Sequence, residues 1–195
     1  MDSSPELVEE IKRFRVGFAY LMDVMYSCAA KSNDPDTHIG AVIVRPEFNK
    51  TVLTADLRRS IVSTGCNHFP RNIKITPAML ERPEKHLWTV HAETDAICCA
   101  ARYGGSLQGC HLFTNGLPCS ECAKVIVESG IASIYIDRGW ESFGDPGFQK
   151  TWAEKFRVSR IMLDAANIPV IPIPYLHNIC SEVRRVPRFK RGQWF

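Results

Sequence analysis

One histidine, one glutamate and two cysteines in this chain have the types and spacing of a catalytic metal site. His91 and Glu93 stand two residues apart in a His-Ala-Glu segment, and Cys119 and Cys122 follow in Pro-Cys-Ser-Glu-Cys. Zinc prefers nitrogen and sulfur ligands in a tetrahedral shell, and a catalytic site takes three protein ligands and leaves the fourth position open. His91, Cys119 and Cys122 supply three ligands. The pattern therefore predicts a bound Zn²⁺ ion with one open position.

Glu93 is predicted to move protons rather than to hold the metal. It lies too close to His91 in the chain to occupy another vertex of the same shell, but beside the open position it can take a proton from water and pass it to a departing amine. The nearby sequence has no second Cys-x-x-Cys or His-x-x-x-His pair that would close a structural site. A structural zinc site also has no need of an unligated carboxylate. The pattern thus favours a zinc hydrolase over a binding module held together by zinc.

Two predicted helices position these residues. One apolar run begins at His91 and stops at Gly104, and another begins at Cys119 and stops at Ser129. The spacing of Cys119 and Cys122 puts both sulfurs on one face of a helix turn. Two helix N-termini would then face one metal, where backbone dipoles and unpaired amide hydrogens favour thiolates.

The remaining elements follow from hydrophobic periodicity. A long N-terminal amphipathic helix is predicted from one apolar face, formed by Leu7, Ile11, Phe14, Phe18, Leu21, Met25 and Cys28. Strands are predicted at residues 38–44, 61–64, 111–114, 133–136 and 170–173, with a last helix through Trp152 and Phe156. This order indicates a sheet that is largely parallel after an antiparallel first pair, with helices on both faces. Pro172 and Pro174 place the last strand at an edge.

Two connections are unusually long. Residues 45–60 are mixed in charge, and we expect an exposed excursion there. Residues 67–90 contain three prolines and no clean period, so we expect a long loop directly before His91. Loops of that length usually serve a function or are disordered.

Composition narrows the class of protein. A chain of 195 residues suits one α/β domain, and a net charge of +3 is too small to argue nucleic-acid binding by itself. No apolar run reaches about 18 residues and the N-terminus lacks the features of a signal peptide, so we expect a cytoplasmic protein without a membrane span. Six further cysteines are expected to be buried free thiols. Residues 181–195 form a basic tail that could contact nucleic acid, although solvated or subunit-docking roles are favoured.

From Met22 to about Pro174 the chain resembles the cytidine and deoxycytidylate deaminase superfamily. The His-Ala-Glu and Pro-Cys-x-x-Cys segments match its two metal motifs. Residues 31–35 (Lys-Ser-Asn-Asp-Pro) and 64–71 (Thr-Gly-Cys-Asn-His-Phe-Pro-Arg) resemble motifs of its deoxycytidylate deaminases. The resemblance implies a three-layer α/β/α sandwich with a five-stranded mixed sheet, and a dimer or hexamer.

The same resemblance assigns roles to residues. It places the zinc ligands at His91, Cys119 and Cys122 and the proton shuttle at Glu93. It also implies that Asn67 contacts the sugar and that the backbone amide of Ala92 faces the pyrimidine ring. Candidates for phosphate binding, by position, are Lys31, Ser32 and Arg71. Asp95 departs from the family, which often has asparagine there.

The expected activity is zinc-dependent hydrolysis of the cytosine amine in a free deoxynucleotide, deoxycytidylate (dCMP) to dUMP and ammonia. The alternative is a nucleic-acid base deaminase, acting on tRNA adenosine or single-strand cytosine through the same metal site. The length of residues 67–90 counts against that alternative, because the tRNA enzymes that resemble this chain have a shorter segment. The expected partner is therefore a small-molecule nucleotide rather than a nucleic acid.

Overall fold

The computed structural model describes residues 15–48, 55–140 and 146–173. Its α-helices are α2 (Arg15–Ala29), α4 (Lys85–Trp88), α5 (Ala92–Arg102), α6 (Ser120–Glu128) and α7 (Pro146–Ala165). The strands are β1 (Gly40–Val44), β2 (Ile61–Cys66), β3 (His111–Thr114), β4 (Ser133–Asp137) and β5 (Val170–Ile173). Two short 3₁₀ helices are η1 (Ala55–Ser60) and η2 (Pro77–Leu80).

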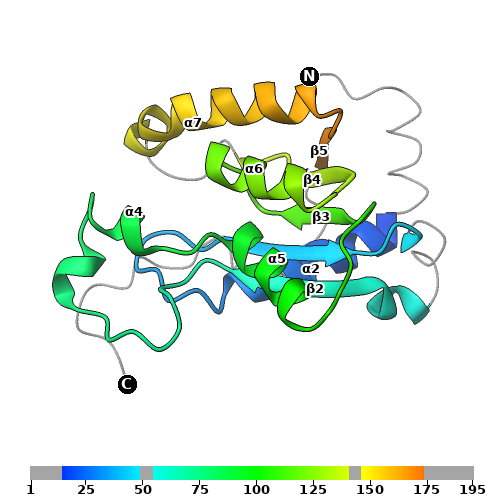
Figure 1. The fold of residues 1–195 in the computed structure, drawn as a ribbon, viewed down its shortest axis with the longest axis horizontal. Coiled ribbons are helices and arrows are strands. Elements are labelled where there is room, and N and C mark those ends of the chain that lie inside the picture. Colours follow the sequence, from blue (N-terminus) through cyan, green and yellow to red (C-terminus); the bar gives the residue numbers. More distant parts are fainter. Residues whose placement is uncertain (1–14, 49–54, 141–145, 174–195) are drawn as a thin grey trace.

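The five strands form one mixed sheet in the order β2-β1-β3-β4-β5 (Figure 1). Strand β1 pairs antiparallel with both β2 and β3, whereas β3, β4 and β5 run parallel to one another. The prediction of a largely parallel sheet after an antiparallel first pair is confirmed. So is the edge position of β5, which contains Pro172, because a proline cannot donate to a neighbouring strand.

Helices cover both faces of this sheet, as the sequence predicted. Side chains alternate along β1, so Ala41 and Ile43 pack beneath α5, α6 and α7, whereas Val42 and Val44 pack against α2. Figure 1 shows α7 and α6 along one end of the sheet and α5 across β1 and β2. The three-layer α/β/α architecture is therefore confirmed.

Two glycines let helices approach the sheet closely. A Cβ atom on Gly40 would lie 2.0 Å from the backbone oxygen of Met25 in α2. One on Gly65 would lie 2.3 Å from the backbone oxygen of Ala92 and 2.5 Å from the backbone nitrogen of Ala96. The first turn of α5 is thus seated directly on β2, which fixes the segment that carries His91 and Glu93.

The prediction of an exposed excursion at residues 45–60 holds for part of the described segment and is wrong for the rest. Residues 45–47, 58 and 59 are exposed, whereas Phe48, Leu57 and Ser60 are buried. Phe48 is fully buried and packs edge-on against Phe18 of α2 and Phe113 of β3, with ring centroids 5.8 Å apart in both pairs. Leu57 of η1 is also buried in that cluster. Phe48 and Leu57 therefore complete the core beneath α2, although the segment around them carries several charged residues.

Some predictions fall on residues outside the described ranges. Leu7, Ile11 and Phe14 of the expected first helix lie there, as does the basic tail at 181–195. Within the described ranges all cysteines are free thiols, as predicted, but of the six further cysteines only Cys110 is buried. Cys28, Cys66 and Cys99 are half-buried, Cys98 is exposed, and Cys180 lies outside the described ranges. No helix in these ranges is both long enough and apolar enough to cross a membrane.

Candidate active site

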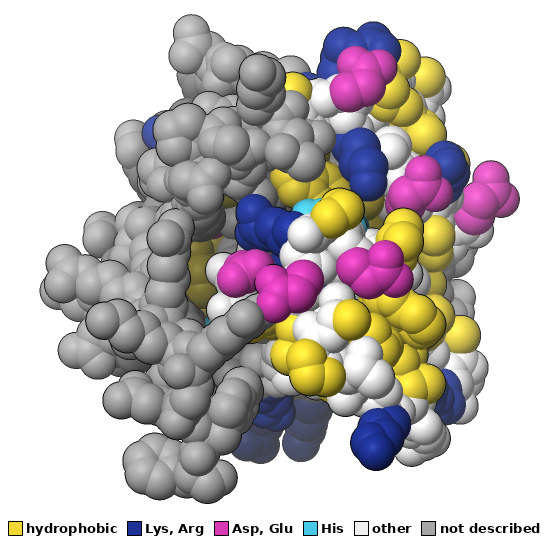
Figure 2. All heavy atoms as spheres, turned by 90° about the vertical axis from the view of Figure 1, so that its left-hand side faces the viewer, with side chains coloured by type: hydrophobic (Ala, Val, Ile, Leu, Met, Phe, Trp, Pro, Cys, Tyr) yellow, Lys and Arg dark blue, Asp and Glu magenta, His cyan; other side chains and the backbone are white. Residues whose placement is uncertain are grey.

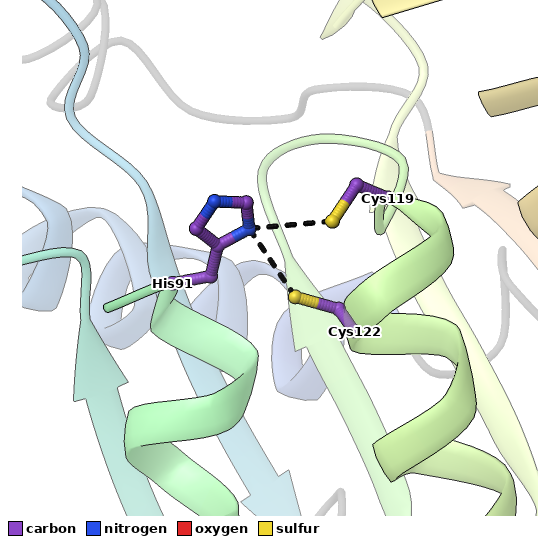
Figure 3. A group of neighbouring side chains, drawn as sticks. All are labelled: His91, Cys119 and Cys122. Carbon is purple, nitrogen blue, oxygen red and sulfur yellow. Dashed lines mark hydrogen bonds between the residues drawn. The ribbon is translucent and has the colours of Figure 1, made fainter. Parts of the chain in front are cut away.

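His91, Cys119 and Cys122 converge, as shown in Figure 3. The Nδ1 atom of His91 lies 3.4 Å from Sγ of Cys119 and 3.3 Å from Sγ of Cys122. Zinc bonds of about 2.0–2.1 Å to nitrogen and about 2.3 Å to sulfur put these atoms about 3.6 Å apart in a tetrahedral shell. The observed separations are close to that value, so this donor set fits a Zn²⁺ ion with three protein ligands.

Both ligand segments sit at helix N-termini. His91 is the residue before α5 and has extended backbone (φ −77°, ψ 152°), and Cys119 stands before α6 in the same conformation (φ −74°, ψ 171°). The first turn of a helix has backbone N–H groups without helical partners, which favour negative charge. The predicted helix starts are confirmed, and they direct two positive dipole ends toward the thiol groups.

Glu93 lies inside this cluster. It sits in the first turn of α5 and is only 4% exposed. The Cys122 thiol donates to its Oε2 atom across 3.5 Å. Burial raises the pKa of the Glu93 carboxyl, against the opposing charge of His91. A raised pKa makes the carboxyl group a better proton acceptor than an exposed glutamate, which suits a general acid–base residue.

One of the two thiols is held ionised even before a metal is considered. A hydrogen bond with Cys122 lowers the pKa of Cys119 to about 4, although burial opposes the shift. Burial alone would lower the pKa of His91, but its hydrogen bond with Cys119 and the charge of Glu93 outweigh burial and raise it. The lowered pKa favours the thiolate form of Cys119, which is the form in which a cysteine binds zinc.

A pocket opens beside these residues, and several separate parts of the chain form its wall. His91, Ala92, Glu93 and Cys119 contribute from the starts of α5 and α6. Other lining residues come from the loop before β1, from Asn67, from α4 and the residue after it, and from α7: Asp34, Thr37, Ile39, Lys85, His86, Thr89, Trp152 and Phe156.

Of the predicted substrate-binding residues, Asn67 and Ala92 line this pocket. The Oδ1 atom of Asn67 accepts the N–H of Ile39 at 2.7 Å, and its Nδ2 atom donates to the carbonyl of Thr37 at 2.8 Å. These bonds tie Asn67 to the loop before β1. The second N–H of its amide is the donor for the predicted contact with a sugar, which stays a prediction.

Lys31, Ser32 and Arg71 do not belong to the pocket lining. The Ser32 hydroxyl donates to the carbonyl of Asn67 at 2.7 Å, and Lys31 is exposed. The guanidinium of Arg71 donates to Oδ1 of Asp95 at 2.8 Å. Arg71 and Ser32 therefore hold the loop that carries Asn67 in place. The structure does not bring Lys31, Ser32 and Arg71 together as a phosphate site.

One known protein family matches most of this chain. The family described as "Cytidine and deoxycytidylate deaminase zinc-binding region" matches residues 18–137, well over half of the chain and all of the metal cluster. The chain belongs to the cytidine and deoxycytidylate deaminase family. Zinc is the metal of this family region, in agreement with the donor set of His91, Cys119 and Cys122.

Similar proteins include other deaminases. An "uncharacterized deaminase in luxG 3'region" of Aliivibrio fischeri is 34% identical over 143 residues, which covers 73% of this chain and 84% of that protein. A "probable deoxycytidylate deaminase" of Drosophila melanogaster is 32% identical over 162 residues, covering 76% and 68%. The solved dCMP deaminase of cyanophage S-TIM5, in complex with dCMP and dUMP, has a TM-score of 0.53 at 17% identity and covers 88% of this chain and 100% of that one. At that identity the structural likeness shows the shared deaminase fold.

In this deaminase family member, sequence reasoning missed an ion pair in the pocket wall. Lys85 is 1% exposed, and its Nζ atom lies 2.7 Å from Oδ1 of Asp34 and 3.0 Å from Oδ2 of Asp36. Asp34 was visible as part of the Asn-Asp-Pro motif. Nothing in the sequence around Lys85 distinguishes it from a surface lysine, because the segment has no periodic pattern.

The aromatic wall of the site was also missed. Trp152 was predicted only as a core position of the last helix, yet its ring centroid lies 5.8 Å from that of His91 and 5.4 Å from that of His86. The ring of Phe156 continues this wall, with its centroid 6.1 Å from that of Trp152. The helical period predicts which residues of α7 face inward but not what they face.

Proposed function

We propose that this protein is a hydrolase that removes the amine at C4 of the cytosine base of a free deoxynucleotide, converting dCMP to dUMP and ammonia. The observation that carries the proposal is a buried carboxyl, Glu93, beside the ligand set of His91, Cys119 and Cys122 in the wall of one pocket. The similar Drosophila protein, named a probable deoxycytidylate deaminase, supports the choice of substrate.

The chemistry assigned to the chain is proton transfer and orientation. Bound zinc supplies a Lewis acid that activates a water molecule at the open coordination position. Glu93 takes one proton from the attacking water as the C4–O bond forms and gives that proton to the ring nitrogen N3. It then takes the proton of the new C4 hydroxyl and gives it to the amine, so that the C4–N bond breaks, the C4 carbonyl forms and ammonia leaves. Ala92, at the start of α5, presents its backbone N–H to the pyrimidine ring.

A free nucleotide is favoured because residues 67–90 are folded into the wall of the pocket. This segment supplies Asn67, Lys85 and His86 to the lining. Its two ends are joined by hydrogen bonds between the backbones of His68 and Val90 at 2.8 and 3.0 Å. A wall built this way encloses a small ligand on several sides, which suits a mononucleotide better than a continuous strand.

The test is ammonia release from purified, zinc-loaded protein. The substrates are deoxycytidine, dCMP, dCTP, their ribose forms, single-stranded DNA, and a tRNA anticodon stem-loop for the adenosine alternative. We expect the highest kcat/KM for dCMP. The control is Glu93→Gln, which should keep zinc but lose at least about a thousandfold in kcat, since two proton transfers lose their catalyst.

Several outcomes would contradict the proposal. Turnover of a nucleic acid, with none of the free nucleotides, would replace it with the nucleic-acid alternative. Activity within a few-fold of wild type in zinc-loaded Glu93→Gln would remove the assigned mechanism. The molar mass of the same preparation in solution tests the expected dimer or hexamer.

A further inference from the structure

Basic side chains from three different elements surround one indole ring in the pocket wall. The ring of Trp152 lies against His86 of α4 and against His91 at the start of α5. The Nζ atom of Lys155, one turn further along α7, lies 4.6 Å from the centroid of the same ring. Figure 2 shows this side of the molecule, where a histidine is set back among hydrophobic, basic and acidic side chains.

The cations near this wall differ in whether a carboxylate neutralises them. Lys85 is paired with Asp34 and Asp36, and Arg82 lies 3.3 Å from Asp36. By contrast, Lys155 forms no ion pair with any residue in the described ranges, and its side chain is exposed.

Lys155 is not itself a lining residue, but its ammonium lies over Trp152, which lines the pocket, and has no direct carboxylate partner among the described residues. Lys124 chiefly, and Lys155 as well, lower the pKa of the exposed Glu121 carboxyl.

His86 adds a hydrogen-bond donor beside this charge. It lines the pocket, and its ring nitrogens have no hydrogen bond within the part of the chain that the structure describes. Burial, together with the charges of Lys85, Arg82 and Lys155, lowers the pKa of His86. A neutral imidazole keeps one N–H donor and adds no positive charge of its own.

We propose that Lys155 and His86 bind the 5′-phosphate of the nucleotide whose base lies beside His91 and Glu93. The Trp152 ring contacts the rings of His86 and His91, and the Lys155 ammonium lies over its face. This one side chain therefore fixes the position of the phosphate relative to the reacting base. This inference rests on the proposed function and deepens it, because it makes the substrate a phosphorylated nucleoside. It gives the phosphate-binding role, expected at Lys31, Ser32 and Arg71, to α4 and α7.

The chemistry of the two groups suits a phosphate monoester. An ammonium group is a compact charge with three donors, and a hydrogen bond from a charged donor to phosphate is about twice as strong as a neutral one. The cation–π contact with Trp152 holds the lysine over the pocket wall without neutralising it. A nucleoside without the phosphate would leave both groups unused.

The test compares the zinc-loaded full chain with Lys155→Met, which keeps the alkyl stem over Trp152, and with His86→Phe, which keeps the aromatic contact. Lys74→Met is the matched control, because Lys74 is an exposed lysine outside the pocket lining. The measurements are kcat/KM for dCMP and for deoxycytidine, and calorimetric Kd values for dUMP and deoxyuridine.

We expect Lys155→Met to lower the preference for dCMP over deoxycytidine by about ten- to hundredfold, the size of one lost charge-assisted hydrogen bond. The preference for dUMP over deoxyuridine in binding should fall by a similar factor, and Lys74→Met should change neither. His86→Phe should lower both preferences by a smaller factor.

Unchanged preferences in Lys155→Met, or equal losses for phosphorylated and unphosphorylated ligands, would overturn the assignment. Wild-type protein that binds dUMP no more tightly than deoxyuridine would overturn it as well. The binding arm needs no turnover, so it decides on the phosphate site even if ammonia release shows that the proposed deaminase activity is wrong.

Discussion

Replacing Lys85 with methionine tests whether the pocket wall depends on a buried charge pair. Lys85 is 1% exposed and Asp34 is 4% exposed, and their side chains meet at 2.7 Å. The methionine side chain is similar in length and apolar, so Lys85→Met removes the charge with little change in packing volume. What remains is a buried carboxylate without its cation.

The expected cost follows from the contacts that Asp34 keeps. Breaking a buried ion pair by removing one partner costs about 3–5 kcal/mol in the free energy of unfolding. Asp34 still accepts the backbone N–H groups of Asp36 at 2.8 Å and Thr37 at 2.9 Å. Those two donors place the cost near the lower end, at about 3 kcal/mol. In a chain of this length such a loss lowers Tm by about 6–12 °C.

The assay is thermal and urea unfolding of the zinc-loaded protein, with two comparison variants. The double variant Lys85→Met/Asp34→Asn removes the uncompensated charge, so we expect it to recover at least half of the lost stability. Lys124→Met breaks an exposed pair with Glu121, which water screens, and should leave Tm almost unchanged. A loss below 1 kcal/mol in Lys85→Met, or no recovery in the double variant, would refute the reasoning.

The remaining predictions concern the metal, the sugar and the seating of α5. Purified protein should hold about one zinc per chain, and Cys119→Ala/Cys122→Ala should lose it; full retention by elemental analysis would refute the ligand assignment. Asn67→Ala should lower kcat/KM for dCMP by about a hundredfold while zinc stays bound, and unchanged kinetics would remove Asn67 from the site. Gly65→Ala should cost at least about 1–3 kcal/mol in unfolding free energy, because its Cβ would lie 2.3 Å from the Ala92 oxygen, whereas Gly116→Ala meets nothing within 4 Å. Equal melting temperatures for the two glycine variants would contradict the close seating of α5 on β2.

The metal cluster could be predicted from sequence because its information is local. His91 and Glu93 stand two residues apart, and Cys119 and Cys122 share one helix turn, so each half of the site is specified by a few consecutive residues. Each half also opens a helix that a run of apolar residues marks. The sheet was predictable for a similar reason, since each strand is short, apolar and bounded by turn residues.

Contacts between distant segments were not predictable in this way. Lys85 and Asp34 lie 51 positions apart, and neither belongs to a periodic pattern that links them. Phe48 fills the core from within a charged segment, and Trp152 looks like any inward position of a helix. The spacing of hydrophobic residues shows which face of a helix or strand is buried. The residues that this face contacts depend on how the helices and strands pack together, which a single sequence does not reveal.

Arg71 shows why position in a motif does not settle a role. It stands close to Asn67 in the chain, and an arginine there was a reasonable candidate for a phosphate. In the structure its guanidinium meets Asp95 at 2.8 Å, and the other carboxylate oxygen of Asp95 accepts the N–H of Cys66 at 3.2 Å. The carboxylate of Asp95, at a position where asparagine is frequent in this family, therefore gives Arg71 a local partner.

The catalytic chemistry and the choice of substrate are assigned to different parts of this fold. The metal ligands and Glu93 lie at the starts of α5 and α6, seated on the sheet. The rest of the pocket wall comes from residues 67–90 and from α7. Two ion pairs hold residues 67–90 in place. Arg71 near one end pairs with Asp95, and Lys85 near the other end pairs with Asp34. Under the proposed function, changes in this wall would alter which nucleotide is bound while Glu93 stays in place. Substitutions at Lys155 or His86 should therefore change substrate preference before they change zinc binding.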